Sequence, residues 1–132
     1  MDARTRSAVR DRAAHQCEYC ALPQRLVPLA PFHVEHVIPK QHGGTDDPEN
    51  LALACYHCNL HKGPNLAGID PETNPITPLF HPRRDAWNDH FSFQGARLTG
   101  LTPIGRVTVQ VLAMNAPGRL ELRAEIGLCE RL

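Results

Sequence analysis

Two matched cysteine pairs, Cys17-Glu-Tyr-Cys20 and Cys55-Tyr-His-Cys58, are the clearest structural signal in this sequence. A Cys-x-x-Cys turn directs both thiolates at one centre, and two such turns complete a tetrahedral zinc site. The alternatives are four ordinary buried cysteines, or one redox pair beside an unrelated pair. The matched spacing favours zinc. The fifth cysteine, Cys129, is expected to be a small buried hydrophobic residue.

The composition fits a small domain that a structural metal would help to stabilise. Of 132 residues, 42% are hydrophobic but only 5% are aromatic, and there are 12 prolines. This predicts one compact, loop-rich domain over 1–132 with a modest core. No segment has the roughly 18 apolar residues of a membrane span, and the first residues do not resemble a signal peptide. We therefore expect a soluble, cytoplasmic protein, in which disulfides are rare.

Local patterns around the cysteine pairs predict a mixed helix and strand core. Good helix formers favour a helix over 3–16, with Thr5 or Asp2 as its cap. Apolar and β-branched residues predict a strand over 33–38 and a return strand over 50–54, joined by a long turn at 43–48. A helix is then expected from Cys58 or Asn59 to Lys62-Gly63.

The second half of the chain has fewer regular patterns. Five prolines between positions 64 and 82 exclude regular structure there. Residues 91–100 suggest a hairpin turning at Gln94-Gly95, and Thr102-Pro103 is a good helix start. Residues 107–128 fit either a hairpin or two helices, and their composition favours two helices.

Chemically reactive groups concentrate between the two cysteine pairs. The adjacent Glu35 and His36 combine a carboxylate with an imidazole, and Asn59 directly follows Cys58. Carboxylate and amide oxygens are ligands for Mg²⁺, and an imidazole can take a proton from water. Together these groups could support metal-assisted phosphodiester hydrolysis. Neighbours in a regular strand face opposite ways, so convergence requires the strand to end or bulge before Pro39. An ordinary exposed strand pair is the alternative.

The segment from Cys17 to Gly63 resembles the HNH endonucleases, in the subclass whose ββα-metal core is framed by two Cys-x-x-Cys turns. The resemblance makes Glu35 a ligand of the catalytic cation and His36 the general base. It implies that Asn50 braces the loop between the strands and that Asn59 completes the cation site. The usual Asp before the histidine is replaced here by Glu, which is one methylene longer.

Other residues are secondary candidates. We expect His33, His42, His57 and His61 to lie at the surface or around the site, with His33, His61 and Lys62 as auxiliary residues. His81 and His90 are expected to be packing or loop residues. The segments Asn65–Asp70 and Pro78–Trp87 and the pair His90-Phe91 resemble an extension that follows the core in many bacterial HNH proteins.

The charge distribution gives little support for a strong polyanion-binding surface. The chain has 14 basic and 14 acidic residues. Only residues 1–30 are enriched in basic side chains, which are Arg4, Arg6, Arg10, Arg12 and Arg25. We expect weak, mostly sequence-independent DNA contact, with targeting by a partner protein.

The sequence therefore predicts an α+β fold: a small ββα-metal, treble-clef-like core over 15–64, held by a four-cysteine zinc site, and an α-rich extension over 65–132. The expected function is metal-dependent cleavage of DNA by an endonuclease that uses structural Zn²⁺ and a catalytic Mg²⁺ or Mn²⁺. The main alternative is a non-catalytic zinc module that binds nucleic acid or protein. A toxin-like nuclease acting on RNA is a weaker one.

Overall fold

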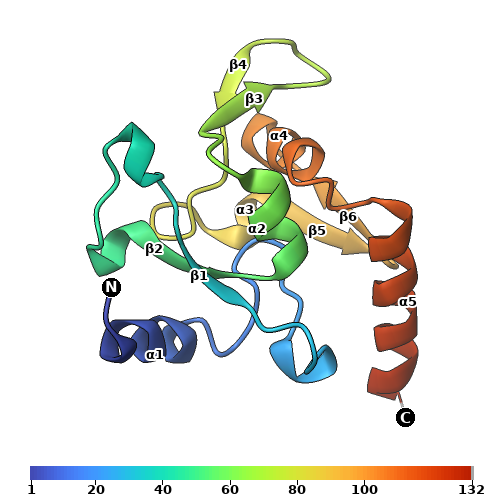
Figure 1. Cartoon of the computed structure of the whole chain (residues 1–132). Coiled ribbons are helices and arrows are strands. Elements are labelled where there is room, and N and C mark those ends of the chain that lie inside the picture. The colour runs from blue at the N-terminus through green and yellow to red at the C-terminus, as the bar shows by residue number, and fades with distance from the viewer. Residues whose placement is uncertain (132) are drawn as a thin grey trace.

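The computed structural model describes the backbone of residues 1–131 and the side chains of residues 1–127. Along the described chain, the main elements are α1 (Ala3–Arg12), β1 (His33–His36), β2 (Leu51–Ala54), α2 (Tyr56–Lys62), β3 (Ala67–Ile69), β4 (Ile76–Pro78), α3 (Trp87–His90), β5 (Phe91–Gln94), β6 (Arg97–Gly100), α4 (Pro103–Val111) and α5 (Pro117–Arg131). The strands form three separate antiparallel hairpins (Figure 1). The fold is therefore α+β, as predicted.

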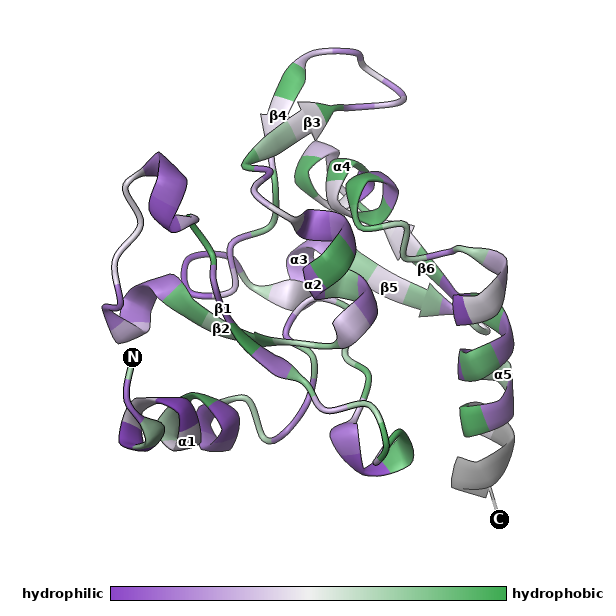
Figure 2. Cartoon of the chain, in the orientation of Figure 1, coloured by the Kyte–Doolittle hydropathy of each residue, from purple (hydrophilic) through white to green (hydrophobic). Residues whose placement is uncertain are grey.

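Helix α1 begins where the sequence suggests but ends early. The Asp2 carboxylate caps it by accepting a hydrogen bond from the Thr5 amide at 2.8 Å. Ala14 and His15 then adopt positive φ values of 53° and 55°, which a continuing α-helix does not allow. This turn sends the chain into the first cysteine pair. The helix is largely hydrophilic and buries only Val9 (Figure 2).

The β1–β2 hairpin lies at the centre of the N-terminal half. His33 pairs with Ala54 and His36 with Leu51. Helices α1 and α2 lie on opposite sides of this hairpin (Figure 1), and every residue of β2 is buried. Strand β1 ends at His36, two residues before the predicted limit at Ile38. The backbone amide and carbonyl of Ile38 bond to the side chain of Asn50 and not to the backbone of β2.

Helix α2 starts earlier than predicted because a cysteine caps it. The Cys55 sulfur accepts a hydrogen bond from the Cys58 amide at 3.4 Å, so the helix includes the residues between the two cysteines. At its other end, Gly63 has a φ of 48°, which lets the chain leave the helix. The second cysteine pair thus forms the first turn of α2.

The expectation of no regular structure over 64–82 is wrong. Strands β3 and β4, which have three residues each, form a short antiparallel hairpin in this segment. Pro71 and Pro75 fall in the connecting loop, and Pro78 is the last residue of β4. Prolines at these places remove few ladder hydrogen bonds, so a short two-stranded hairpin tolerates them.

The later elements confirm the remaining predictions. Strands β5 and β6 form the expected hairpin, and Thr102 caps α4 by accepting from the Gly105 amide at 3.0 Å. The segment 107–128 forms the end of α4, a turn over 112–116 and most of α5, so it is helical and not a hairpin. A Cβ atom on Gly105 would lie 2.1 Å from the His90 carbonyl oxygen, so glycine is needed for α4 to approach so closely. The extension has two hairpins, but α4 and α5 are its longest elements.

The extension packs directly on the cysteine-bearing half. The Trp87 indole donates to the Tyr19 carbonyl at 2.8 Å, and His57 Nε2 lies 2.8 Å from the Ala113 carbonyl oxygen. Arg83 also forms an ion pair with Glu18. One buried apolar cluster includes residues of both halves. Within the described chain, no helix is long and apolar enough to cross a membrane.

Candidate active site

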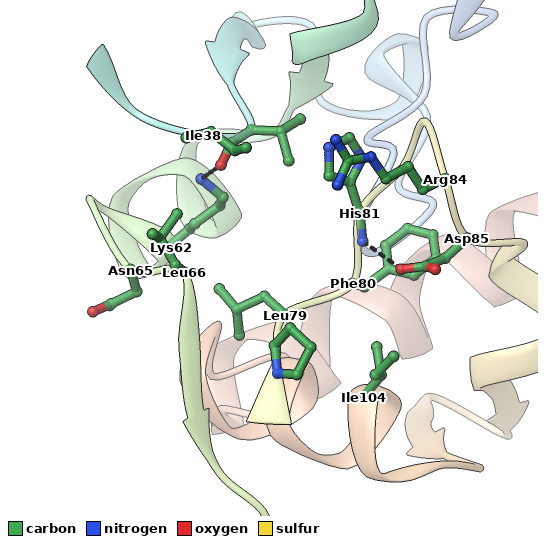
Figure 3. A pocket seen from close by; sticks show the side chains of 12 residues that line it. Ile38, Lys62, Asn65, Leu66, Leu79, Phe80, His81, Arg84, Asp85 and Ile104 are labelled. Carbon is green, nitrogen blue, oxygen red and sulfur yellow. Dashed lines mark hydrogen bonds between the residues drawn. The ribbon is translucent and has the colours of Figure 1, made fainter. Parts of the chain in front are cut away.

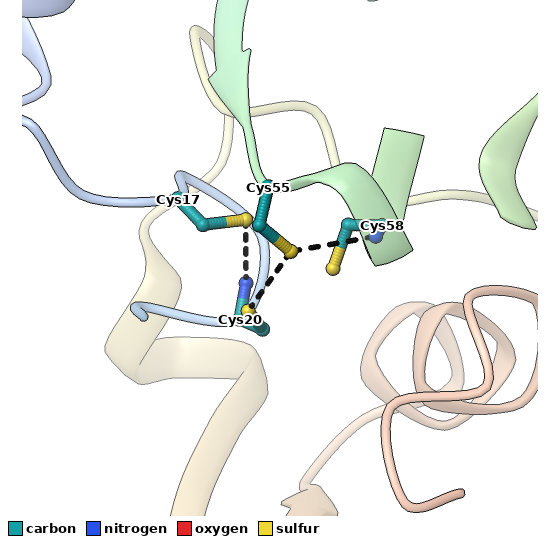
Figure 4. Close-up of side chains that lie close together, drawn as sticks. All are labelled: Cys17, Cys20, Cys55 and Cys58. Atoms are coloured by element: carbon teal, nitrogen blue, oxygen red, sulfur yellow. Dashed lines mark hydrogen bonds between the residues drawn. The ribbon is translucent and has the colours of Figure 1, made fainter. Parts of the chain in front are cut away.

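The four cysteines of the two pairs converge on one point (Figure 4). Their sulfur atoms all lie within 4.8 Å of one another, and all four residues are buried. The Cys20 and Cys58 amides donate to the Cys17 and Cys55 sulfurs, both at 3.4 Å. This set of four thiol donors could hold one metal ion, as the sequence predicts. The predicted burial of Cys129 lies outside the described side chains.

Positive charge from the extension reaches this cluster. The Arg119 guanidinium lies 3.6 Å from the Cys55 sulfur. Hydrogen bonds with Cys17, Cys20 and Cys58 lower the pKa of Cys55. Both features favour the thiolate, which is the form of cysteine that binds a metal. The donor set therefore fits a soft or borderline metal ion.

Asn50 braces the loop between β1 and β2. Its side-chain oxygen accepts from the Ile38 amide at 2.9 Å, and its nitrogen donates to the carbonyls of Ile38 at 3.0 Å and Thr45 at 2.9 Å. Gly44 makes this close arrangement possible, because a Cβ atom there would lie 1.6 Å from the Ile38 carbonyl oxygen. The contacts agree with the bracing role implied by the resemblance.

His36 sits at the end of β1 with Asp46 as its partner. Its Nε2 lies 2.7 Å from Asp46 Oδ1, while the α-ammonium of Met1 lies 3.2 Å from Asp46 Oδ2. The hydrogen bond with His36 lowers the pKa of Asp46 to about 2. Asp46 is therefore ionised at neutral pH and can only accept, so His36 Nε2 carries a proton. In the neutral ring, Nδ1 then holds the free lone pair.

Glu35 points to the other side of the strand from His36, into a buried polar contact. Both residues pair regularly with β2, so β1 has no bulge that would turn the two side chains to one side, which their convergence within the strand would require. The Tyr19 hydroxyl donates to Glu35 Oε1, and Lys62 Nζ lies 3.2 Å from Oε2. Only 9% of Glu35 is exposed. Burial raises the pKa of this carboxyl, while Lys62 and Tyr19 act in the opposite direction. The ion pair with Lys62 therefore favours the carboxylate in a site that otherwise disfavours charge.

Lys62 also fastens the end of α2 to the end of β1. Its ammonium donates to the Val37 carbonyl at 2.9 Å and the His36 carbonyl at 3.3 Å. Asn59 lies one helical turn earlier, on a neighbouring face of α2. The half-buried Asn59 side chain makes no hydrogen bond to a residue that the structure describes. Its amide oxygen therefore remains available as a ligand.

The comparison with known families matches this part of the chain. The family model of the HNH endonucleases matches residues 17–65. The chain carries an HNH domain. The match runs from the first cysteine to just beyond α2, and it includes the four-cysteine cluster and the β1–β2–α2 unit. No curated protein and no solved structure matches the chain.

The remaining histidines of the HNH domain contact other groups. His33 is exposed, with its ring centre 6.4 Å from that of Tyr56. The rings of His57 and His61 lie 4.2 Å apart, and His57 bonds the extension at Ala113. His42 is exposed in the loop that Asn50 braces. Among the described contacts, none joins these four residues to Glu35 or His36.

The sequence does not predict the hydrogen-bond partners of His36 and Glu35. Asp46, which bonds His36, is predicted only as part of a turn. Tyr19, which bonds Glu35, lies inside the first Cys-x-x-Cys pair, where a tyrosine carries no special signal. A polar residue in the loop after a strand-end histidine is a recognisable hint, so Asp46 could have been suspected.

Part of the basic N-terminal segment has a structural role. Arg12 donates to the carbonyls of Pro48 at 3.0 Å and Leu51 at 2.8 Å, and Arg10 donates to Phe32 at 3.3 Å. These bonds attach α1 to the β1–β2 hairpin of the HNH domain. The guanidinium groups of Arg10 and Arg12 are therefore partly engaged within the protein. Both residues are weaker candidates for phosphate contacts than the sequence suggests.

Proposed function

We propose that this protein is a metal-dependent endonuclease that hydrolyses DNA phosphodiester bonds, cutting one or both strands. The observation that carries the proposal is the His36–Asp46 pair, in a segment that the HNH family model matches. A carboxylate that fixes the tautomer of a histidine is the arrangement expected of a general base. The side chain of His36 is 21% exposed, so water and substrate can reach it.

In this proposal, His36 Nδ1 accepts a proton from the attacking water. The Nε2 proton remains on the ring in its hydrogen bond to Asp46. As the ring becomes positively charged, the ionised Asp46 stabilises it electrostatically. Water attacks the phosphorus atom, the bond to the 3′ oxygen breaks, and this leaving oxygen takes a proton from solvent. The products are a 5′-phosphate and a 3′-hydroxyl, as the family resemblance implies.

Glu35 and Asn59 are the residues that would hold the catalytic cation. A carboxylate has about four lone-pair positions, and Tyr19 and Lys62 engage two of them in Glu35. The amide oxygen of Asn59 has no partner among the described residues. This carboxylate and amide set suits Mg²⁺ or Mn²⁺. A bound cation supplies positive charge that stabilises the developing charge on the phosphate and the leaving oxygen.

Zn²⁺ is the ion that we propose for Cys17, Cys20, Cys55 and Cys58. Four buried cysteines that complete a tetrahedral set of thiolates are typical of a structural zinc site and not a catalytic one. Zinc would join the loop after α1 to the first turn of α2, and so hold these two segments of the HNH domain together. His33, His61 and Lys62 keep auxiliary roles, and the contacts of Lys62 suggest that it positions Glu35.

DNA is the proposed substrate, bound weakly and largely without regard to sequence, with a partner protein for targeting. The predicted cytoplasmic location remains a prediction. A second candidate function is a non-catalytic zinc module that binds nucleic acid or protein. One observation favours it: Glu35 is buried, and both of its oxygens already contact Tyr19 and Lys62.

Nicking of supercoiled plasmid separates the two functions. Purified protein should convert the plasmid to open circles with Mg²⁺ or Mn²⁺ and not without a divalent cation. His36→Ala should lower the rate about 10²- to 10⁴-fold, the usual contribution of a general base. His42→Ala is the matched control, because it removes an exposed histidine from the loop that follows β1, and it should keep the rate. Persistent nicking by His36→Ala would refute the assignment of the base.

A further inference from the structure

A pocket lies where the extension meets the end of β1 and α2 (Figure 3). Its volume is about 320 Å³. Apolar side chains form most of its wall, including Ile38, Leu66, Leu79, Phe80 and Ile104. Val37 and Lys62, which adjoin the proposed active site, line it as well. The pocket is therefore next to the HNH residues, and segments of the extension form most of its wall.

Two side chains of the extension give this apolar pocket a polar edge. His81 and Arg84 line it, and they also line a second hollow over the loop that Asn50 braces. Figure 3 shows both side chains at one edge of the pocket, with Leu66 and Leu79 along other sides. The two hollows thus meet at His81, Arg84 and Ile38. The second one also contains Asp47 and Glu49, which makes it a poor site for a phosphate.

Local hydrogen bonds set the chemical character of His81. The Arg83 amide donates to His81 Nδ1 at 3.1 Å, so Nδ1 is the acceptor and the proton of the neutral ring is on Nε2. Burial lowers the pKa of His81, and the nearby Arg84 acts in the same direction. The Asp85 carboxylate accepts from the His81 amide at 2.9 Å and holds the turn. His81 is thus a neutral donor through Nε2.

Arg84 supplies the positive charge at this edge. It is exposed, and its guanidinium makes no hydrogen bond or ion pair with a residue that the structure describes. By contrast, Arg83 beside it is held by Glu18. Lys62 and Asp85 also line the pocket, but Lys62 is paired with Glu35 and Asp85 accepts from the His81 amide. The pocket therefore adds one neutral donor and one free cation to its apolar walls. Such a combination suits a flat, acceptor-bearing ring attached to an anion.

We infer that this pocket receives one unpaired nucleobase of the DNA substrate, with Arg84 on its adjoining phosphate and His81 donating to the base. The inference rests on the proposed function, because it names the form of DNA that the same site binds. A bare phosphate would not need the apolar walls, and about 300 Å³ is the lower end of ordinary ligand pockets, too small for a duplex. A base removed from its stack is recognised by this combination of apolar contact and hydrogen bonding.

Binding of DNA hairpins in divalent-free buffer tests this inference. One hairpin carries a single unpaired 2-aminopurine, whose fluorescence reports binding, and an otherwise identical hairpin carries an abasic site there and a remote dye. The wild-type protein should bind the unpaired base about tenfold more tightly than the abasic site, the scale of contacts to one base. Equal affinity for the two hairpins, or no binding of either, would overturn the inference.

Two variants localise the preference to the pocket. Leu66→Trp fills the pocket without changing charge, and Arg84→Gln removes the free cation. Leu66→Trp should reduce the tenfold preference to about twofold or less. Arg84→Gln should instead weaken the binding of both hairpins, because the abasic hairpin keeps the phosphate that Arg84 contacts. Their controls are Leu101→Trp and Arg97→Gln, which alter exposed residues outside the pocket. If Leu66→Trp kept the full preference, the base would bind elsewhere and the inference would be wrong.

Plasmid nicking with Mg²⁺ is measured on the same protein samples. Nicking without a preference for the unpaired base overturns the inference and leaves the proposed function intact. A preference without any nicking supports the pocket and contradicts the nuclease. The two ideas therefore fail in different measurements.

Discussion

Asp46 holds the imidazole of His36 through a 2.7 Å contact between Oδ1 and Nε2. Asn50 braces the loop that connects the two residues. Within this loop, Gly44 packs directly against the Ile38 carbonyl oxygen. Because the carboxylate is ionised at neutral pH, it selects one tautomer of His36 and leaves Nδ1 free. The loop between the strands thus orients the proposed base.

Asp46→Asn should therefore slow cleavage without preventing DNA binding. The amide can present its nitrogen to His36 and favour the wrong tautomer, so we expect kcat to fall about tenfold or more while KM changes little. Steady-state nicking rates at several DNA concentrations separate the two constants. Glu49→Gln removes an exposed carboxylate from the same loop and is the control. A rise in KM at constant kcat would mean that Asp46 serves substrate binding.

Gly44→Ala should destabilise the fold strongly. The new Cβ atom would lie 1.6 Å from the Ile38 carbonyl oxygen and 2.9 Å from Asn50 Nδ2, so the braced loop must move. We expect a loss of about 2 to 4 kcal/mol in the free energy of unfolding, measured by urea denaturation. Gly118→Ala, whose Cβ would meet nothing within 4 Å, should be neutral or stabilising. Equal effects of the two changes would contradict the role of Gly44.

The ion pair of Asp70 with Arg106 predicts a pH-dependent contribution to stability. Arg106 Nε and Nη2 lie 3.0 and 2.8 Å from the oxygens of Asp70, whose exposure is 0%. Arg106 lowers the pKa of Asp70 well below its usual value. A lowered folded-state pKa gives stability that is present above the unfolded value of about 4 and is lost as pH falls below it.

Asp70→Asn measures that contribution. The variant should be less stable than the wild type at pH 7, and the difference should shrink towards pH 3, in urea unfolding at each pH. Comparing variants cancels the common loss of metal in acid. Asp89→Asn, an exposed residue of α3, should show no such trend. A difference between wild type and Asp70→Asn that did not change with pH would refute the prediction.

Removal of one cysteine should release the structural metal. We expect about one zinc per wild-type chain by elemental analysis, and much less for Cys58→Ser, which removes one of four thiols. Metal loss should lower the melting temperature strongly, because binding and folding are coupled. Cys129→Ser, which leaves all four thiols of the cluster in place, should keep the zinc. Full zinc content in folded Cys58→Ser would show that the four sulfurs do not form the site.

Strong local signals explain why much of the fold could be predicted. The two Cys-x-x-Cys pairs, the Thr102-Pro103 helix start and the hairpin turn at Gly95 each depend on residues close in sequence. The bracing role of Asn50 comes from the family resemblance, and the structure has the corresponding contacts.

The missed features depend on contacts between distant residues. Lys62 is buried because it meets Glu35 and two carbonyls of another element, which helix propensity does not reveal. The β3–β4 hairpin forms despite its prolines because they fall in its loop and at its end. Asp46 becomes the partner of His36 only when the loop folds back.

The dependence of the cleavage rate on Mg²⁺ or Mn²⁺ concentration tests the central claim most directly. Wild type, Glu35→Ala and Asn59→Ala are compared, with Glu49→Gln as the control. Both site variants should need more cation for half-maximal rate, and Glu35→Ala should need the most because it loses the charged ligand. High cation concentration should partly rescue Asn59→Ala, and zinc content should not change. Equal half-saturation in all four proteins would contradict a shared cation site, and a rate without divalent dependence would contradict the metal-dependent nuclease itself.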